Sequence, residues 1–279
     1  MRLVPIIALT MMAFAANSVL NRLALAETSI SAVDFALYRV GFGALTLFIL
    51  LALRGGLATG RFSAASSLGL IAYMLGFSLG YQSMEAGLGA LLLFGVVQLT
   101  MFGGALYLGE RPPWVSYAGA GLGFAGLVVV LAPSGEADIQ SIAALSMIVA
   151  GIGWGVFSLA GRGAAAPLAT TFRAFLVTLP AIAALALWQG IGAMDPVGLG
   201  YAALSGAIMS GLGYAMWYWV LPQIQATTAA LSQLTVPLIA MAGGALFLGE
   251  TVGLRFVIGS LLVLSGVILP IWWRQRGLR

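Results

Sequence analysis

Two apolar segments of the sequence carry aromatic and polar residues at helical spacing. Phe14, Asn17 and Asn21 stand at positions i, i+3 and i+7, and Trp154 and Ser158 stand at i and i+4, so each group lies on one face of a helix. Amide and hydroxyl groups hydrogen-bond polar solutes, and aromatic rings stack on apolar ones. The same side chains also suit contacts between neighbouring helices. We interpret both faces as candidate substrate-binding surfaces, with helix packing as the alternative.

Five further side chains have types that suit a small amphipathic solute. Gln98 and Gln233 each place an amide inside an apolar segment, where it can hold the carboxylate or the ammonium group of an amino acid. Tyr81 and Tyr214 end matching Leu-Gly-Tyr triplets, and Trp217 follows Tyr214 on a related face; their rings offer stacking and cation–π surfaces. The alternatives are a hydrogen bond between helices for Gln233 and a place in the aromatic belt at the membrane surface for Tyr81. We include all five as substrate-binding candidates.

The sequence lacks the residues that most catalysis and metal binding require. It has neither Cys nor His, which excludes disulfides, thiolate or imidazole metal sites and a nucleophile activated by His. Intramembrane enzymes also use paired carboxylates, yet no Asp or Glu lies near the middle of a predicted helix. We therefore expect a protein that is not an enzyme and that has no metal and no cofactor. The same absence favours facilitated transport over proton coupling.

The composition is typical of membrane proteins. Hydrophobic residues make up 61% of the 279 residues, charged residues make up 7%, and the mean hydropathy is +1.07, against roughly 45–50% apolar and 25% charged residues in soluble domains. The apolar runs are continuous, as in transmembrane helices, and lack the short alternating segments of a membrane barrel. The net charge of +4 comes from isolated Arg residues, with no cluster that would bind nucleic acid. These features predict an all-α integral membrane protein.

An octapeptide that occurs twice divides the chain into two halves. Gly-Gly-Ala-Leu-Tyr-Leu-Gly-Glu at 103–110 recurs as Gly-Gly-Ala-Leu-Phe-Leu-Gly-Glu at 243–250. Each half holds five apolar segments, so the second copy must enter the membrane from the opposite side to the first. We predict ten transmembrane helices as two inverted five-helix repeats, residues 1–133 and 141–273. The segments are approximately 3–25, 32–53, 66–83, 87–108, 114–132, 141–160, 168–188, 197–221, 227–248 and 254–273.

The Arg residues predict the orientation in the membrane. Short cytoplasmic loops carry an excess of positive charge, and most of the Arg residues fall on one side of the predicted helices, whereas the acidic loop residues fall on the other. Arg255 is the exception. We expect both termini to be cytoplasmic. The residues that carry this prediction are Arg2, Arg54, Arg61, Arg111, Arg162, Arg274, Arg276 and Arg279.

Four charged residues recur at matching positions of the two repeats. Arg39 and Arg173 lie near the starts of their helices, and Glu110 and Glu250 end the two octapeptides. A pair between Arg39 and Glu110 would have to span roughly 30 Å of hydrocarbon. We therefore hypothesise that Arg39 neutralises Glu250 and that Arg173 neutralises Glu110. The four residues would then be gate or structural charges, and the alternative is that their side chains reach the lipid headgroups.

The chain resembles the drug/metabolite transporter superfamily, in its ten-helix EamA form. One departure is the proline usual in the fourth and ninth helices, which is present as Pro237 but replaced by Val97 in the first copy. The resemblance covers essentially the whole chain and rests on features found in both copies: Leu-Gly-Glu at 108–110 and 248–250, the aromatic Phe14 and Trp154, and the early Arg39 and Arg173. It implies a carrier of the bacterial inner membrane, most often an exporter, and within the superfamily the sequence is similar to the aromatic amino-acid exporters called YddG.

These observations together predict a carrier that exports small metabolites, with aromatic or other apolar amino acids as the expected substrates. Inverted repeats can exchange conformations around a site near the midplane, which gives alternating access at a cavity between the repeats. We expect facilitated uniport. The alternatives are a proton-coupled drug or metabolite antiporter and, in a different class, a channel or a structural membrane bundle. The expected partners are a small-molecule substrate and the lipid bilayer, and the oligomeric state is left open.

Overall fold

Every regular element that the structure describes is a helix. The computed structural model describes residues 3–54, 62–109, 111–131, 137–162, 164–193, 195–224, 229 and 232–276. Within these ranges, five helices are long and apolar enough to cross a membrane, and four further helices are apolar but shorter. The protein is therefore an all-α, multi-pass membrane protein, which confirms the fold class predicted from the sequence.

The helices follow the predicted apolar segments closely. One difference is that α6 begins at Ala137, four residues before the predicted start of the sixth segment at residue 141. The first repeat holds α1 (Leu3–Glu27), α2 (Ala32–Leu53), α3 (Ala64–Gly80), α4 (Ala86–Tyr107) and α5 (Trp114–Leu131). The second repeat holds α6 (Ala137–Gly161), α7 (Pro167–Gln189), α8 (Pro196–Leu204), η1 (Ser205–Leu212), α9 (Gly213–Val220), η2 (Leu221–Gln223), α11 (Thr235–Leu248) and α12 (Leu254–Arg276).

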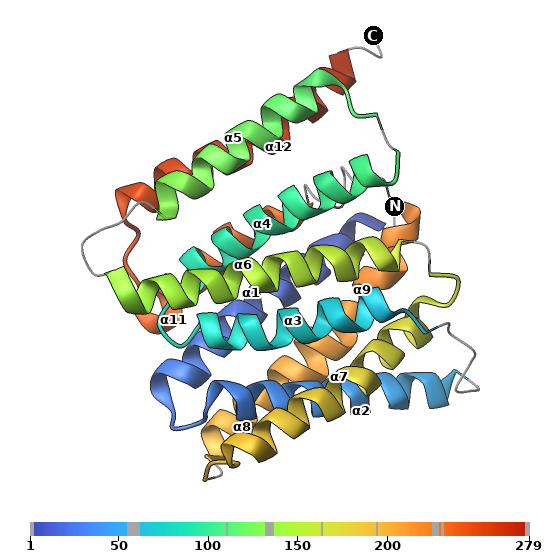
Figure 1. Cartoon of the computed structure of the whole chain (residues 1–279), viewed down its shortest axis with the longest axis vertical. Helices are drawn as coiled ribbons and strands as arrows, with labels where there is room; N and C mark the ends of the chain where they lie inside the picture. Colours follow the sequence, from blue (N-terminus) through green and yellow to red (C-terminus); the bar gives the residue numbers. More distant parts are fainter. Residues whose placement is uncertain are drawn as a thin grey trace.

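The two repeats run in opposite directions through the bundle. In Figure 1, α1 runs from the end that holds the N-terminus to the opposite end, and α6, the first helix of the second repeat, runs back. The pairs α4 with α11 and α5 with α12 are opposed in the same way (Figure 1). Both chain termini lie at one end, which we call the terminal end; the other is the opposite end. The repeats are thus inverted, as the odd number of segments in each half predicted.

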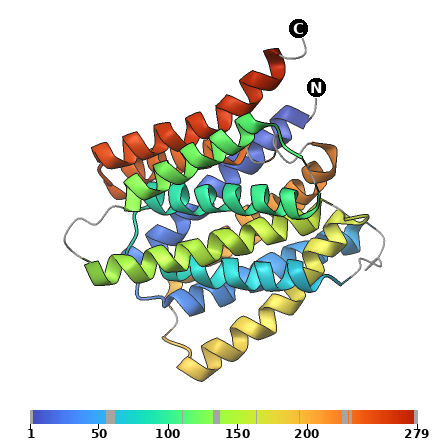
Figure 2. The same cartoon turned by 45° about the horizontal axis from the view of Figure 1, so that its top comes forward.

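The main helix contacts join one repeat to the other. Helix α3 packs against α6, α4 against α6 and α11, and α2 against α7 and η1. Figures 1 and 2 both show α5 and α12 side by side at one edge. The contact of α3 with α6 is so close that a Cβ atom added to Gly153 would lie 2.5 Å from the carbonyl oxygen of Gly69. Neither repeat buries its apolar faces alone, so a site inside the bundle is built from both.

A turn at the end of each octapeptide explains its Leu-Gly-Glu sequence. Gly109 has φ 84° after α4, and Gly249 has φ 64° after α11. This left-handed conformation is strained for residues with a side chain and is the usual end of a helix at glycine. After this turn the backbone N–H of Glu250 bonds the carbonyl oxygen of Gly244 in α11, and the Glu250 side chain reaches Ala86 at the start of α4.

The predicted eighth segment is one continuous helical segment whose middle part is not α-helical. Helices α8 and α9 are continuous with η1, which is a π-helix. π-Helices are rare, usually no longer than a single turn, and frequent at functional sites; η1 has eight residues. Here it faces α1 and α2, and a Cβ atom on Gly206 would collide with the backbone carbonyl of Arg39. The sequence did not predict this feature.

Candidate functional site

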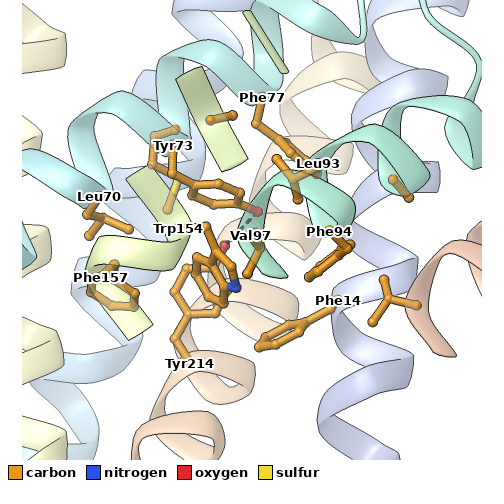
Figure 3. Close-up of a cluster of buried hydrophobic side chains, with 14 of the residues drawn as sticks. Phe14, Leu70, Tyr73, Phe77, Leu93, Phe94, Val97, Trp154, Phe157 and Tyr214 are labelled. Carbon is orange, nitrogen blue, oxygen red and sulfur yellow. Dashed lines mark hydrogen bonds between the residues drawn. The ribbon is translucent and has the colours of Figure 1, made fainter. Parts of the chain in front are cut away.

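Aromatic side chains from both repeats meet inside the bundle (Figure 3). The ring centroid of Trp154 lies 4.8 Å from that of Tyr73, 4.8 Å from that of Tyr214 and 5.1 Å from that of Phe14. Such edge-on and tilted pairs are the favourable arrangements of aromatic rings. We call the following residues, none more than 4% exposed, the aromatic cluster: Phe14, Tyr73, Phe77, Trp154, Phe157, Tyr214 and Trp217.

Arg39 lies against this cluster with its side chain fully buried. Its Nη2 atom donates to the hydroxyl oxygens of Tyr73 (3.0 Å) and Tyr214 (2.6 Å), and its Nε donates to Ser210 Oγ (2.9 Å). The guanidinium carbon also stands 4.9 Å from the ring centroid of Phe77, within the range of a cation–π contact. Arg39 of the first repeat is therefore held by residues of both repeats, with Ser210 and Tyr214 coming from the second.

Asn17 forms a second polar link between the repeats. Its Oδ1 accepts from Ser205 Oγ at 2.6 Å, and its Nδ2 donates to Ser210 Oγ at 3.2 Å. Residues five apart lie about 140° apart on an α-helix of 3.6 residues per turn, but almost on one face of a π-helix, which bonds to the fifth residue. The π-helix η1 thus allows Ser205 and Ser210 to reach the same amide.

Two other pairs of predicted site residues bind each other. Trp154 Nε1 donates to Gln233 Oε1 at 2.7 Å, and Trp217 Nε1 donates to Ser158 Oγ at 3.4 Å. All four side chains are buried. In this conformation they satisfy each other's polar groups, as the helix-packing alternative requires, and they do so beside the aromatic cluster.

The remaining substrate-binding candidates lie around the cluster or apart from it. Asn21 is buried on α1, where it donates to the carbonyl oxygen of Asn17 and accepts from Ser78 Oγ. Tyr81 is the C-cap of α3, and its ring meets that of Phe77 edge-to-face at a centroid distance of 4.7 Å. It therefore ends a row of rings that leads to Trp154 through Tyr73. Gln98 is half-buried on α4, and its Oε1 is buried without a hydrogen-bond partner. No described hydrogen bond joins Gln98 to the cluster.

Carboxylates tie the repeats together at the opposite end of the bundle. Asp195, the N-cap of α8, accepts hydrogen bonds from the backbone N–H and the hydroxyl of Ser29, both at 3.0 Å. The backbone N–H groups of Ser29 and Gly198 hold the pKa of Asp195 below its usual value. Asp34 accepts from the backbone N–H of Gly192 at 3.1 Å. Asp195 thus joins the turn between α1 and α2 to the start of α8, and Asp34 joins the first turn of α2 to the segment between α7 and α8.

Glu250 makes the third such tie and does not pair with Arg39. Its two oxygens accept from the backbone N–H of Ala86, the first residue of α4, at 2.9 and 2.8 Å, and Oε1 lies 3.6 Å from Nε of Arg22. Partial burial raises the pKa of Glu250, and the Ala86 N–H opposes that shift. The predicted pair of Arg39 with Glu250 is therefore wrong, because the partner of Glu250 is Arg22. Arg173 is half-buried on α7, and its predicted partner Glu110 lies outside the described residues.

The sequence comparison decides the family. The EamA-like transporter family matches the chain twice, at residues 2–132 and 141–272. The chain belongs to the EamA-like transporter family. The Leu-Gly-Glu endings and the matched aromatic and Arg positions indicated the same family from the sequence.

Relatives of this EamA-like transporter include proteins named for different solutes. An uncharacterized protein of Pseudomonas aeruginosa is 43% identical over 263 residues, which are 94% of this chain and 91% of that protein. A probable terminal-alkyne amino-acid exporter of Streptantibioticus cattleyicolor is 24% identical over 215 residues, 72% of this chain and 69% of that protein. A riboflavin transporter of Rhizobium johnstonii is 27% identical over 198 residues, 67% of this chain and 65% of that protein. A small-molecule substrate and a lipid bilayer are thus the partners that the family implies.

A solved crystal structure has the same fold as this EamA-like transporter. Its TM-score is 0.67 at 19% sequence identity, and the match covers 96% of this chain and 98% of that chain. At that identity the likeness concerns the fold alone.

Sequence reasoning missed three residues that the structure places prominently. Tyr73 lies at the centre of the aromatic cluster, and Ser210 joins Arg39 to Asn17. Neither type is unusual in a membrane helix, so nothing in the sequence distinguished them. Arg22 carried a usable signal, because it recurs as Arg162 at the same place in the second repeat.

The tie at Glu250 makes a prediction about stability in this EamA-like transporter. Glu85 is the N-cap residue of α4, but its side chain accepts no hydrogen bond from the helix. Glu250 therefore supplies the only described side-chain hydrogen bond that caps this helix. We expect Glu250→Ala to lower the free energy of unfolding by about 1 kcal/mol, the usual contribution of an N-cap. Melting of the detergent-purified protein measures this. Glu85→Ala is the matched control, and an equal loss in both variants would contradict the capping role.

Proposed function

We propose that this EamA-like transporter is a carrier that exports small amphipathic metabolites, with aromatic or other apolar amino acids as substrates. Transport would be facilitated uniport by alternating access between the two repeats. The observation that carries the proposal is the aromatic cluster with Arg39, Asn17 and Ser210 beside it, which both repeats build and which is buried in this conformation. A site between inverted repeats is reached from either side as the repeats rock.

The chemistry of the cluster supports an amphipathic solute. The rings of Phe14, Trp154 and Tyr214 offer faces and edges to an apolar or aromatic side chain, and Arg39, Asn17 and Ser210 supply polar groups next to them. The amino-acid exporter among the relatives agrees with this substrate class, whereas the riboflavin transporter indicates that aromatic solutes of other kinds are handled in the family.

For the orientation and the repeat boundaries we propose the arrangement predicted from the sequence. We place the terminal end in the cytoplasm of a bacterial cell, with the protein in the inner membrane, because most of the Arg residues that the structure describes lie at helix ends on that side. The two repeats that would exchange conformations during transport are residues 1–133 and 141–273. In this orientation the ties of Asp34, Asp195 and Glu250 close the outer side. The proposal assigns no catalysis to the protein.

A flux measurement tests the proposal. The purified protein is reconstituted in liposomes, and the uptake of labelled L-phenylalanine is followed with and without a pH gradient. We expect uptake that saturates with substrate concentration and proceeds without the gradient. Strict dependence on the gradient would instead support a proton-coupled antiporter, and uptake that rises without saturation would support a channel.

A further inference from the structure

Arg39 is a buried cation whose described partners are all neutral. Of its five N–H donors, one bonds Ser210 and two bond Tyr73 and Tyr214. The remaining two N–H donors belong to Nη1, and this atom is buried without a hydrogen-bond partner. A buried guanidinium is stable only when it is paired and fully hydrogen-bonded. The ring of Phe77 compensates the charge in part through its cation–π contact.

The acidic side chains that the structure describes are not available to Arg39. Asp34, which shares α2 with Arg39, is already bonded to Ser31 and Gly192. All the carboxylates whose side chains the structure describes lie at the ends of helices or just beyond them: Glu27, Asp34, Glu85, Asp195 and Glu250. An ionised residue inside the membrane that faces the bundle marks a transport pathway by default.

The free donors of Arg39 have the chemistry of a carboxylate site. The planar guanidinium binds a carboxylate through two N–H groups, and charge-assisted bonds of this kind are roughly twice as strong as neutral ones. The aromatic cluster adjoins the same guanidinium through Tyr73 and Phe77. A small molecule with an aromatic ring and a carboxylate would therefore place its ring against the aromatic cluster and its carboxylate against the guanidinium.

We propose that Arg39 binds the carboxylate of the substrate through Nη1 and that the matching ligand is an aromatic monocarboxylate. This inference rests on the proposed transport function and deepens it. A monoanion neutralises Arg39, whereas a zwitterion leaves the site with one positive charge, because no described carboxylate is there to meet an ammonium group. The carboxylate, and not the ammonium group, is thus the part of an amino acid that the site selects.

The proposal is tested with four ligands that each carry a phenyl ring. These are L-phenylalanine, 3-phenylpropionate, 2-phenylethylamine and L-phenylalaninamide. The binding of each ligand is measured from the shift in melting temperature of the wild-type protein in detergent. We expect 3-phenylpropionate to bind at least as tightly as L-phenylalanine. The two ligands without a carboxylate should bind about tenfold more weakly or worse, since a hydrogen bond to a charged group is lost. Equal binding of the amine and the carboxylates would overturn the proposal.

Substitution of Arg39 provides the second test. Arg39→Gln should retain the fold, since it removes an unpaired buried charge, and should bring the affinities of the carboxylate and amine ligands to within about threefold of each other. Arg173→Gln, at the equivalent position of the second repeat, should keep the wild-type order of ligands. A preference for carboxylates that survives in Arg39→Gln would overturn the proposal. If Arg39→Gln does not fold, the binding of the four ligands to the wild-type protein still tests the proposal.

The outcome separates this inference from the proposed function. If the wild-type protein binds carboxylates selectively but moves no L-phenylalanine, the amino-acid substrate is wrong and the role of Arg39 stands. If it moves L-phenylalanine and binds the amine as well as the acid, the role of Arg39 is wrong and the transport function stands.

Discussion

Replacement of Trp154 by alanine is expected to reduce the transport of an aromatic substrate by at least about tenfold. The Trp154 ring contacts Tyr73, Tyr214 and Phe14, and its Nε1 bonds Gln233. Alanine removes all of these contacts and leaves a void, which costs about 3–5 kcal/mol of unfolding free energy for a large buried aromatic side chain. Uptake of labelled L-phenylalanine into liposomes, normalised to folded protein, measures the effect.

Two further variants separate the loss of the binding surface from the loss of stability. Trp154→Phe keeps a ring in the cluster but loses the donor to Gln233, so we expect it to fold and to retain part of the transport activity. Trp188→Ala removes an indole that is 82% exposed at the end of α7, and its transport rate should match the wild type. Equal activity in Trp154→Ala and Trp188→Ala, at equal amounts of folded protein, would contradict a substrate site at the cluster.

Asn17→Asp should lower the affinity for a carboxylate ligand by about tenfold or more and raise the melting temperature of the empty protein. Asn17 Nδ2 and Arg39 Nε bond the same Ser210 oxygen, at 3.2 and 2.9 Å, so the new carboxylate would lie within about 6 Å of the guanidinium, close enough to act as its counter-ion. The side chain keeps its size. A built-in carboxylate would then take the place of the carboxylate of the ligand.

Asn21→Asp is the matched control for this substitution. It adds the same charge one helical turn along α1, where the side chain bonds Ser78 and the backbone of Asn17 and has no described hydrogen bond to Arg39 or Ser210. We expect it to leave the affinity for 3-phenylpropionate within about threefold of the wild type. A similar loss in both variants would indicate a general effect of a buried negative charge and would contradict a specific effect on Arg39.

Much of the fold and part of the site follow from simple sequence patterns. Continuous apolar runs predicted the helices because a membrane requires backbone groups to be satisfied within each span. The doubled octapeptide and the odd number of segments predicted inverted repeats. The repeat also directed attention to Phe14 and Trp154 together, and their rings are in contact across the two repeats.

The central position of Arg39 could not be predicted in the same way. Its place near the start of a helix gave its depth, but not which side of the helix faces the bundle. That choice depends on the contact of α2 with η1, where Gly206 allows the two backbones to meet. The π-helix itself leaves no sequence signal that distinguishes it from an α-helix with several glycines. The pair of Arg39 with Glu250 failed for a related reason, since depth alone did not distinguish Arg39 from Arg22.

The most direct test of the central claim is the accessibility of position 210 from the two sides of the membrane. The chain contains no cysteine, so Ser210→Cys introduces a single thiol between Arg39 and Asn17. A membrane-impermeant maleimide should label it from either side, and 3-phenylpropionate should slow the labelling. Ser29→Cys, in the exposed turn after α1, should react from one side only and at the same rate with ligand. Labelling of position 210 from a single side, from neither side, or at a rate that the ligand does not change would contradict an alternating-access site between the repeats.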